Sequence, residues 1–309
     1  MSTARAVVFG YHDVGVRCLK TLISGGVDVP LVVTVPDDPT ETQWFASVAA
    51  TAAHYGIEAI TPSDANTPEL QHTIAELQPD FIFSFYYRSM LGAPILRIAG
   101  RGALNMHGSM LPKYRGRAPV NWAILRGERE TGATLHYMVE RADAGEIVDQ
   151  LAVPILQDDD AREVFAKVTV AAETVLARSL PGLIAGTAPR TIQPIEPGQY
   201  FGRRRPEDGR IDWAWPAVQI HNLVRAVAPP FPGAFADVEG QRWRIHKTRV
   251  AMRSASPSSS ARLVGMNGQC HVECQDGSVL QLLAVVTAAG PLNLQALAVE
   301  LSQRPRLLA

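Results

Sequence analysis

The sequence predicts an α/β protein in which a doubly wound parallel sheet is followed by a second, smaller β-barrel domain. Short apolar runs alternate with segments of helical spacing over the first part of the chain, the pattern of strands joined by crossover helices. The composition changes at residues 188–209, where Pro, Gly and Arg gather as in a linker. Beyond this segment, strand-like runs follow one another at tight turns. We therefore place the first domain at residues 1–200 and the second at residues 201–309.

Four apolar runs, each bounded by Gly, Pro or Asp, are expected to be β-strands: residues 5–10, 28–35, 79–87 and 101–108. Three segments between them have the apolar spacing of helices: residues 14–26, 45–56 and 67–78. In such sheets, ligands bind at the carboxyl ends of the strands. We therefore expect a site where residues 84–90 and 105–110 follow their strands.

The later elements are assigned by the same criteria. We expect a helix at residues 119–128, strands at 131–139 and within 142–155, and a long helix within 158–186 that opens with carboxylates suited to a helix N-terminus. The second domain has one expected helix at residues 217–228, followed by strand-like runs at 233–250 and 261–286. Turn residues at Gly240, Asn267-Gly268 and Asp276-Gly277 indicate hairpins of a small barrel.

Charge and cysteine content limit the partners and the cellular compartment that we expect for this protein. The chain has 309 residues and a net charge of -1, so no global field attracts polyanions. Three cysteines give no even disulfide framework, which indicates a reducing, cytoplasmic setting. The first residues lack a signal peptide, and no apolar run approaches the roughly 20 residues of a membrane span. We expect a soluble cytoplasmic protein.

Two segments resemble cofactor or metal motifs only weakly. Residues 9–15, "FGYHDVG", follow the first strand but lack the G-x-G-x-x-G pattern, which argues against a nicotinamide cofactor. Cys270, His271 and Cys274 lie close together, yet Cys270 and Cys274 fall on one face of an expected strand and no second ligand pair follows. We expect packing thiols there and no metal.

The segment at residues 105–119, "NMHGSMLPKYRGRAP", is the strongest candidate for chemistry. Asn105 and His107 are two residues apart, so in a strand both side chains project from one face. For such a pair alone, a structural role would be favoured. A Gly- and Pro-containing basic loop follows directly, with Lys113, Arg115 and Arg117 near the imidazole. Its place at the end of a parallel strand favours a functional site.

Asp143 is the third candidate, flanked by small residues that allow close approach of a ligand. An Asp in a turn is most often a local turn-former. Beside His107, however, it would orient the imidazole and favour its protonated form. The three residues would then suit acyl transfer to an amine, with His107 moving protons and Asn105 and the imidazole stabilising the oxyanion of a tetrahedral intermediate. The lack of a G-x-S-x-G elbow argues against a covalent hydrolase.

The segments at residues 105–124 and 130–148 resemble the signature of the 10-formyltetrahydrofolate-dependent formyltransferases, and the likeness continues through 201–213 and 228–235. The family includes methionyl-tRNA, glycinamide ribonucleotide and sugar-amine formyltransferases. The resemblance implies a Rossmann-like formyl-donor domain followed by a smaller barrel-like (OB-like) domain. It also implies 10-formyltetrahydrofolate as the formyl donor, with no metal.

The resemblance further implies residue roles. His107 would be the proton shuttle, Asn105 would stabilise the transition state, and Asp143 would support the imidazole. The folate site would be lined by Ser89, Met90, Leu91, Arg117, Val139, Glu140, Arg141 and Ala142. Arg203, Arg204 and Arg205 are candidates for contact with a substrate diphosphate, the alternative being a solvated linker.

Within the family, residues 9–15, 83–88 and 111–122 look most similar to the formyltransferase part of the bifunctional polymyxin-resistance protein. That enzyme formylates UDP-4-amino-4-deoxy-L-arabinose on the route to lipid A modification. The loop at residues 34–44 is short and acidic, unlike the basic loop with which the methionyl-tRNA enzyme grips tRNA. The bifunctional protein continues into a decarboxylase domain, whereas this chain ends at Ala309. We therefore expect a stand-alone enzyme, which could act on another nucleotide-linked amino sugar.

We therefore expect a formyltransferase that acts on a small nucleotide-linked amino sugar, with neither nucleic acid nor membrane as a partner. Methionyl-tRNA formylation is the alternative in the same class. A non-catalytic folate or nucleotide-sugar binding protein is the alternative in another class, and hydrolysis of the formyl donor is a third. The oligomeric state is not predicted.

Overall fold

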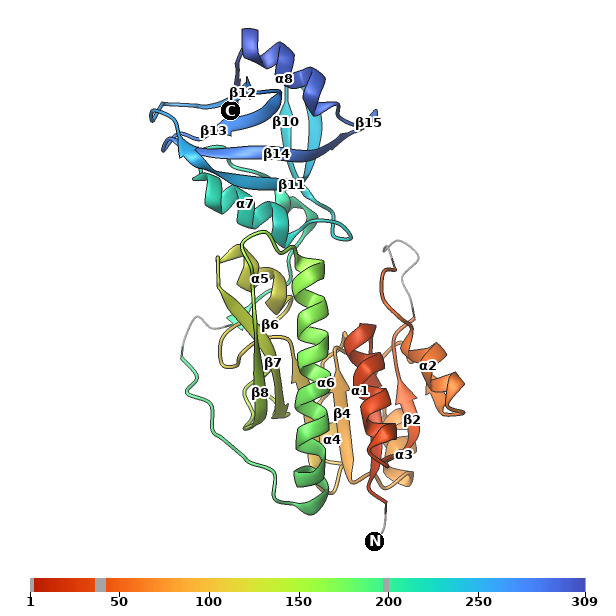
Figure 1. Ribbon diagram of the computed structural model, residues 1–309. Coiled ribbons are helices and arrows are strands. Elements are labelled where there is room, and N and C mark those ends of the chain that lie inside the picture. Colours follow the sequence, from red (N-terminus) through yellow and green to blue (C-terminus); the bar gives the residue numbers. More distant parts are fainter. Residues whose placement is uncertain (1–2, 37–42, 197–199, 309) are drawn as a thin grey trace. The chain divides into compact units, whose positions relative to one another are not determined.

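The computed structural model describes residues 3–36, 43–196 and 200–308, which form two compact units (Figure 1). The first unit comprises Met1–Pro119, Glu130–Pro154 and Phe165–Gly202, and the second comprises Val120–Arg129, Ile155–Val164 and Arg203–Ala309. The domain boundary placed between residues 200 and 201 stays a prediction. Parts of the acidic loop (residues 37–42) and of the linker (residues 197–199) lie outside the described residues.

The first unit is built on a seven-stranded sheet with the order β3-β2-β1-β4-β5-β7-β8. Its strands are β1 (Arg5–Gly10), β2 (Asp28–Val33), β3 (Glu58–Ile60), β4 (Phe81–Phe85), β5 (Gly102–His107), β7 (Glu130–Tyr137) and β8 (Ile147–Pro154). Strands β1 to β5 pair in parallel, whereas β7 and β8 are antiparallel additions. The Rossmann-like sheet is confirmed, with the difference that it is mixed.

Helices cover both faces of this sheet. They are α1 (His12–Ser24), α2 (Val48–His54), α3 (Pro68–Glu76), α4 (Ala93–Leu96) and, from Phe165 on, α6 (Ala161–Ala185). In Figure 1, α1 and α6 lie in front of the sheet, and an ion pair of 2.6 Å joins Arg17 of α1 to Glu173 of α6. Leu70 and Ile74 of α3 and Ile95 of α4 share a core cluster with strands β1, β2 and β4.

The long helix α6 corrects one expectation from the sequence. Among the described helices it is the one with the length and hydropathy to cross a membrane, and half of its apolar window is buried inside the protein. By length and mean hydropathy α6 is thus an exception to the expectation that no apolar run approaches a membrane span, although Glu173 and Arg178 interrupt its apolar residues. Its burial matches that of a core helix in a folded domain.

The second unit is a curled antiparallel sheet with the order β10-β11-β14-β13-β12-β16 (Figure 1). Its strands are β10 (Ala234–Val238), β11 (Gln241–Ser254), β12 (Ala261–Met266), β13 (Gln269–Glu273), β14 (Ser278–Thr287), the short β15 (Gly290–Pro291) and β16 (Arg306–Leu308). Its other elements are α5 (Pro119–Leu125, from Val120 on), α7 (Ala217–Ala226), α8 (Leu294–Gln303) and the 3-10 helix Pro206–Gly209. This half-barrel confirms the smaller barrel-like domain, and α8 was not predicted.

Local sequence explains the hairpins and the thiols of this unit. Asn267 and Gly268 both have positive φ, of 51° and 73°, as a two-residue hairpin turn requires. Cys270 and Cys274 lie in the core of the half-barrel with exposed fractions of 1% and 0%. The packing role expected for these thiols is what the structure shows.

Gly265 marks the closest approach of α8 to the sheet, which generates a stability prediction. A Cβ added at Gly265 would lie 1.7 Å from the carbonyl oxygen of Ala298 in α8. We expect Gly265→Ala to lower the free energy of unfolding by about 1–3 kcal/mol, because strand and helix must separate. Urea unfolding, followed by the fluorescence of Trp213 and Trp243 in this unit, measures the effect.

Gly100→Ala is the matched control, since a Cβ there meets no heavy atom within 4 Å. Equal stabilities of the two variants would contradict the close packing of α8 on β12.

Candidate active site

Strand β5 presents Asn105 and His107 at its carboxyl end, two residues apart. In the register of the sheet, Asn105 lies opposite His136 of β7, and His107 lies opposite Thr134. His107 is buried, with an exposed fraction of 6%. The period of the strand therefore sets both candidate side chains next to a second imidazole that the sequence did not single out.

The loop between β7 and β8 brings Asp143 to this pair. Asp143 Oδ1 lies 3.5 Å from His107 Nδ1 and 3.3 Å from Asn105 Nδ2. The residue has φ of 52°, a left-handed conformation that Asp and Asn tolerate better than most residues. The buried side chain of Gln193 donates to the carbonyls of Asp143 and Gly145 at 3.1 and 2.6 Å and fixes the loop.

The basic loop folds back over the same three side chains. His107 Nε2 donates to the carbonyl of Tyr114 at 2.9 Å, because a carbonyl only accepts. The backbone N–H of Gly116 donates to Asp143 Oδ2 at 2.8 Å. Strand β6 (Arg115–Gly116) pairs with β9 (Tyr200–Phe201), and the Tyr114 ring stacks on Phe201 with centroids 4.9 Å apart.

These contacts determine the orientation of the His107 imidazole and which of its nitrogens carries the hydrogen. Its Nε2 carries a hydrogen that is held by Tyr114, so Nδ1 is the atom that faces Asp143. A neutral ring has its lone pair on Nδ1, and a protonated ring directs an N–H⁺ from Nδ1 toward the carboxylate. Nδ1 is therefore the position at which a proton can be taken up and returned.

His136 is the residue that sequence reasoning missed. Its Nδ1 donates to the carbonyl of Tyr137 at 2.8 Å, which leaves Nε2 of the neutral ring as an acceptor, 3.2 Å from Asn105 Nδ2. Nε2 also lies 3.5 Å from Asp143 Oδ1. Both amide hydrogens of Asn105 are thus directed to His136 and Asp143 through long hydrogen bonds, and an oxyanion near Nδ2 would compete with these two acceptors.

The electrostatics of the site centre on Asp143. Burial by itself opposes ionisation of this carboxyl, but the imidazole of His107 and the backbone N–H of Gly116 outweigh it. Together they hold the pKa of Asp143 well below its usual range. The arrangement is a buried carboxylate between two imidazoles, which can stabilise a positive charge on His107 during proton transfer.

The segments expected to line a folate site are the loops that follow β4 and β7, and the second of these loops carries Asp143. Leu91 is buried in the same core cluster against which Met138 packs, so the loops after β4 and β7 border one cluster. Arg117 donates to the carbonyl of Arg88 at 3.4 Å. Ser89, Met90, Val139, Glu140 and Arg141 are exposed, and Ala142 is half-buried. Their contact with folate stays a prediction.

The three arginines proposed for the substrate diphosphate belong to the second unit. Arg204 lies over the ring of Trp122 at 4.9 Å and donates to the carbonyl of Asp208 at 2.8 Å. The backbone N–H of Arg205 donates to the Asp208 carboxylate at 2.7 Å. Arg203 is exposed. Their role in substrate binding stays a prediction.

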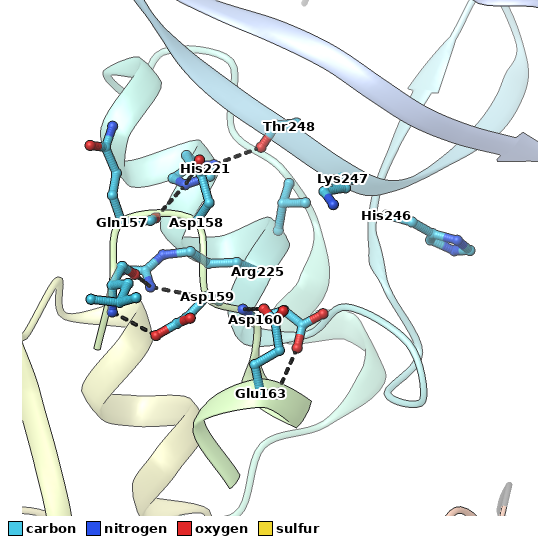
Figure 2. A pocket seen from close by; sticks show the side chains of 12 residues that line it. Gln157, Asp158, Asp159, Asp160, Glu163, His221, Arg225, His246, Lys247 and Thr248 are labelled. Carbon is cyan, nitrogen blue, oxygen red and sulfur yellow. Dashed lines mark hydrogen bonds and ion pairs between the residues drawn. The ribbon is translucent and has the colours of Figure 1, made fainter. Parts of the chain in front are cut away.

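A cavity of about 400 Å³ lies within the second unit, between α7, β11 and the loop that precedes α6 (Figure 2). His221 bonds to Thr248 and to the carbonyl of Gln157, both at 2.9 Å. Arg225 donates to the carbonyls of Leu156 and Asp159. The buried side chains of His221 and Arg225 are thus hydrogen-bonded to groups that line the cavity, and these bonds connect α7 to the loop that precedes α6.

In the part of the chain that the structure describes, no cluster of three His, Cys, Asp or Glu side chains could hold a metal ion.

The low pKa of Asp143 generates a stability prediction. Asp143→Asn removes the charge and tolerates the left-handed φ, and we expect it to lower the free energy of unfolding by about 1–3 kcal/mol at neutral pH. The ionised carboxylate stabilises the fold above its unfolded-state pKa of about 3.9, and this contribution is lost as the pH falls through the lower folded-state pKa. The deficit should therefore persist down to about pH 4 and shrink below it.

Urea unfolding of both proteins across this pH range measures the deficit. Glu130→Gln, which neutralises an exposed carboxylate at the start of β7, is the control. A deficit that grows on acidification would show that Asp143 is protonated in the folded protein.

Comparison with known proteins gives this site a family. Residues 4–180 match the family described as formyl transferase, and residues 204–295 match the formyl transferase C-terminal domain. An N-formyltransferase from Helicobacter canadensis, solved with folinic acid and dTDP-3-aminofucose, is 21% identical with a TM-score of 0.71, and the match covers 91% of this chain and 99% of that chain.

Two further solved structures share the fold. WlaRD, a sugar 3N-formyl transferase solved in the presence of dTDP and 5-N-formyl-THF, is 19% identical with a TM-score of 0.71, covering 95% of this chain and 99% of that chain. HypX from Aquifex aeolicus, in complex with tetrahydrofolic acid, is 18% identical with a TM-score of 0.62, covering 93% and 45%. At these identities the likeness is one of fold. Because the first family match spans residues 4–180 of 309, the chain belongs to the formyl transferase family.

Proposed function

We propose that this formyltransferase transfers a formyl group from 10-formyltetrahydrofolate to the amino group of a nucleotide-linked amino sugar. The observation that carries the proposal is the convergence of Asn105, His107 and Asp143 within 3.5 Å at the end of β5. Similar folds are those of an N-formyltransferase solved with folinic acid and dTDP-3-aminofucose and of a sugar 3N-formyl transferase. Folate as the donor and a nucleotide sugar as the acceptor fit both.

The chemistry assigns a task to each side chain. The transfer forms a bond between the sugar nitrogen and the formyl carbon, breaks the bond from that carbon to the folate nitrogen, and moves one proton from the first nitrogen to the second. His107 Nδ1 takes up and returns this proton, while Asp143 stabilises the charged imidazole. The amide of Asn105 turns from His136 and Asp143 toward the oxyanion.

In this proposal, loops of the first unit bind the formyl donor. Ser89, Met90 and Leu91 follow β4, and Val139 to Ala142 directly precede Asp143. Because Leu91 and Met138 border the same core cluster, both loops are anchored on one side of β4 and β5. Backbone groups of these loops and Arg117 would hold the folate, and the bound donor would carry its formyl group to His107.

The finer assignment is UDP-4-amino-4-deoxy-L-arabinose, which would place the protein on the route to lipid A modification and polymyxin resistance. It is supported by the motifs at residues 9–15, 83–88 and 111–122. The acceptor is a small molecule, since the net charge of -1 provides no global attraction for tRNA. A cytoplasmic location follows from the same proposal, because folate and sugar nucleotides are the reactants.

Asn105 and His107 on β5 generate a prediction about catalysis. We expect His107→Ala and Asn105→Ala to lower kcat by roughly 100-fold or more, the usual contribution of a positioned acid–base or oxyanion group. Steady-state assays of purified variants, with circular dichroism to verify folding, measure the effect. His72→Ala is the control, because its side chain is 76% exposed on α3. Near wild-type kcat in either β5 variant would overturn its role.

The identity of the acceptor is tested with candidate amino sugars. Mass spectrometry of UDP- and dTDP-linked amino sugars, incubated with enzyme and 10-formyltetrahydrofolate, should show one sugar that gains a formyl group. Charged initiator tRNA and a reaction without amine are run alongside. Formylated methionyl-tRNA would replace the sugar proposal, and release of formate without an acceptor would indicate hydrolysis. Binding of folate with no product in any arm would indicate a non-catalytic binding protein.

A further inference from the structure

Arg115 is a buried cation at the candidate site. It is 3% exposed, and its Nε and Nη1 atoms have no hydrogen-bond partner among the described residues. A guanidinium remains charged in a protein, and burying one without partners costs several kcal/mol. Most buried polar groups are paired, so two unpartnered N–H-bearing nitrogens of a buried guanidinium beside a candidate site call for a partner that enters from outside.

The position of Arg115 ties it to the chemistry. The residue before it supplies the carbonyl that holds His107, and the residue after it supplies the N–H that holds Asp143. One edge of this segment thus contacts the candidate residues, and β6 pairs with β9. Arg115 is therefore fixed on a short strand beside the reacting groups.

A second cation lies within electrostatic reach. Burial is the main influence that lowers the pKa of Arg115, and the charge of Arg141 lowers it further, while Asp143 and Tyr200 act in the opposite direction. Arg141 is exposed, on the loop that carries Asp143. Two guanidinium groups that repel each other, one buried and one at the rim, are both stabilised when an anion lies between them.

We propose that Arg115, with Arg141 at the rim, forms an anion subsite that binds the diphosphate of the nucleotide-linked acceptor. This inference rests on the proposed function for the identity of the acceptor. Guanidinium groups bind phosphate oxygens through charge-assisted hydrogen bonds, and the unpartnered Nε and Nη1 of Arg115 each have an N–H to donate. The diphosphate would hold the sugar amine beside His107, so that Arg115 positions the acceptor.

The carboxylates of the folate tail carry the same charge, and the experiment separates the two sources. Isothermal titration measures binding of UDP, dTDP and folinic acid to wild type, Arg115→Met and Arg115→Lys. We expect Arg115→Met to weaken binding of the nucleoside diphosphate by about 10- to 100-fold and to change folinic acid binding by less than about twofold. Arg115→Lys should recover part of the affinity, because it keeps the charge and loses the planar guanidinium with its several N–H donors.

Arg97→Met is the matched control, since it removes an exposed arginine at the end of α4 in the same unit. The melting temperature of the unliganded protein provides a readout that a structural role would move. Removing an unpaired buried charge should leave it unchanged or raise it, whereas loss of a structural ion pair would lower it.

Three results overturn the inference: unchanged nucleoside diphosphate affinity in Arg115→Met, absence of nucleoside diphosphate binding by the wild type, or a loss confined to folinic acid. Failure of the proposed function is a separate result, because it appears as the absence of formylated sugar from the wild-type reaction. Binding of the nucleoside diphosphate is measured without turnover, so the two failures are distinguishable.

Discussion

The carboxylate of Asp143 is the contact on which the candidate site depends. Its two oxygens lie against three other segments of the chain: β5 with Asn105 and His107, β7 with His136, and the basic loop through the N–H of Gly116. A neutral group in this position would accept fewer hydrogen bonds and would fix neither amide nor imidazole. The charge of one buried side chain therefore sets the orientation of every other group.

The backbone around this carboxylate adopts conformations that most residues avoid. Asp143 and Tyr114 both have left-handed φ, of 52° and 56°. Such conformations persist where surrounding contacts over-determine them. Here Gln193 holds the carbonyl of Asp143, while His107 and the stacked ring of Phe201 hold Tyr114. The rigid sheet and its hydrogen bonds thus offset the cost of placing two loops against β5.

Sequence periodicity predicted most of the elements and part of the site. Alternation along β5 predicted that Asn105 and His107 share a face, because that is a local property of a strand. The small residues around Asp143 made it a candidate, but its approach to His107 depends on the turn between β7 and β8, which the sequence alone does not show. His136 was missed because its nearness to Asn105 is set by antiparallel register, which no local pattern of either strand encodes. The helix α8 was missed for a related reason, since its short apolar segment follows a run of strands and was included in the barrel.

The charges of the molecule act locally, and this bears on the size of the acceptor. A polymer with many phosphates is bound through an extended cationic surface, whose contacts release counterions along its length. This chain has 29 basic and 30 acidic residues, so attraction must come from particular groups. Arg115 is 3% exposed, so its guanidinium would be accessible only to a small anion. In the proposed subsite, the burial of Arg115 would make its interaction with an entering phosphate strong, because little water would screen it. Desolvation of this one arginine would then select for a compact, doubly charged group over a polyanion, next to the residues proposed to move the proton.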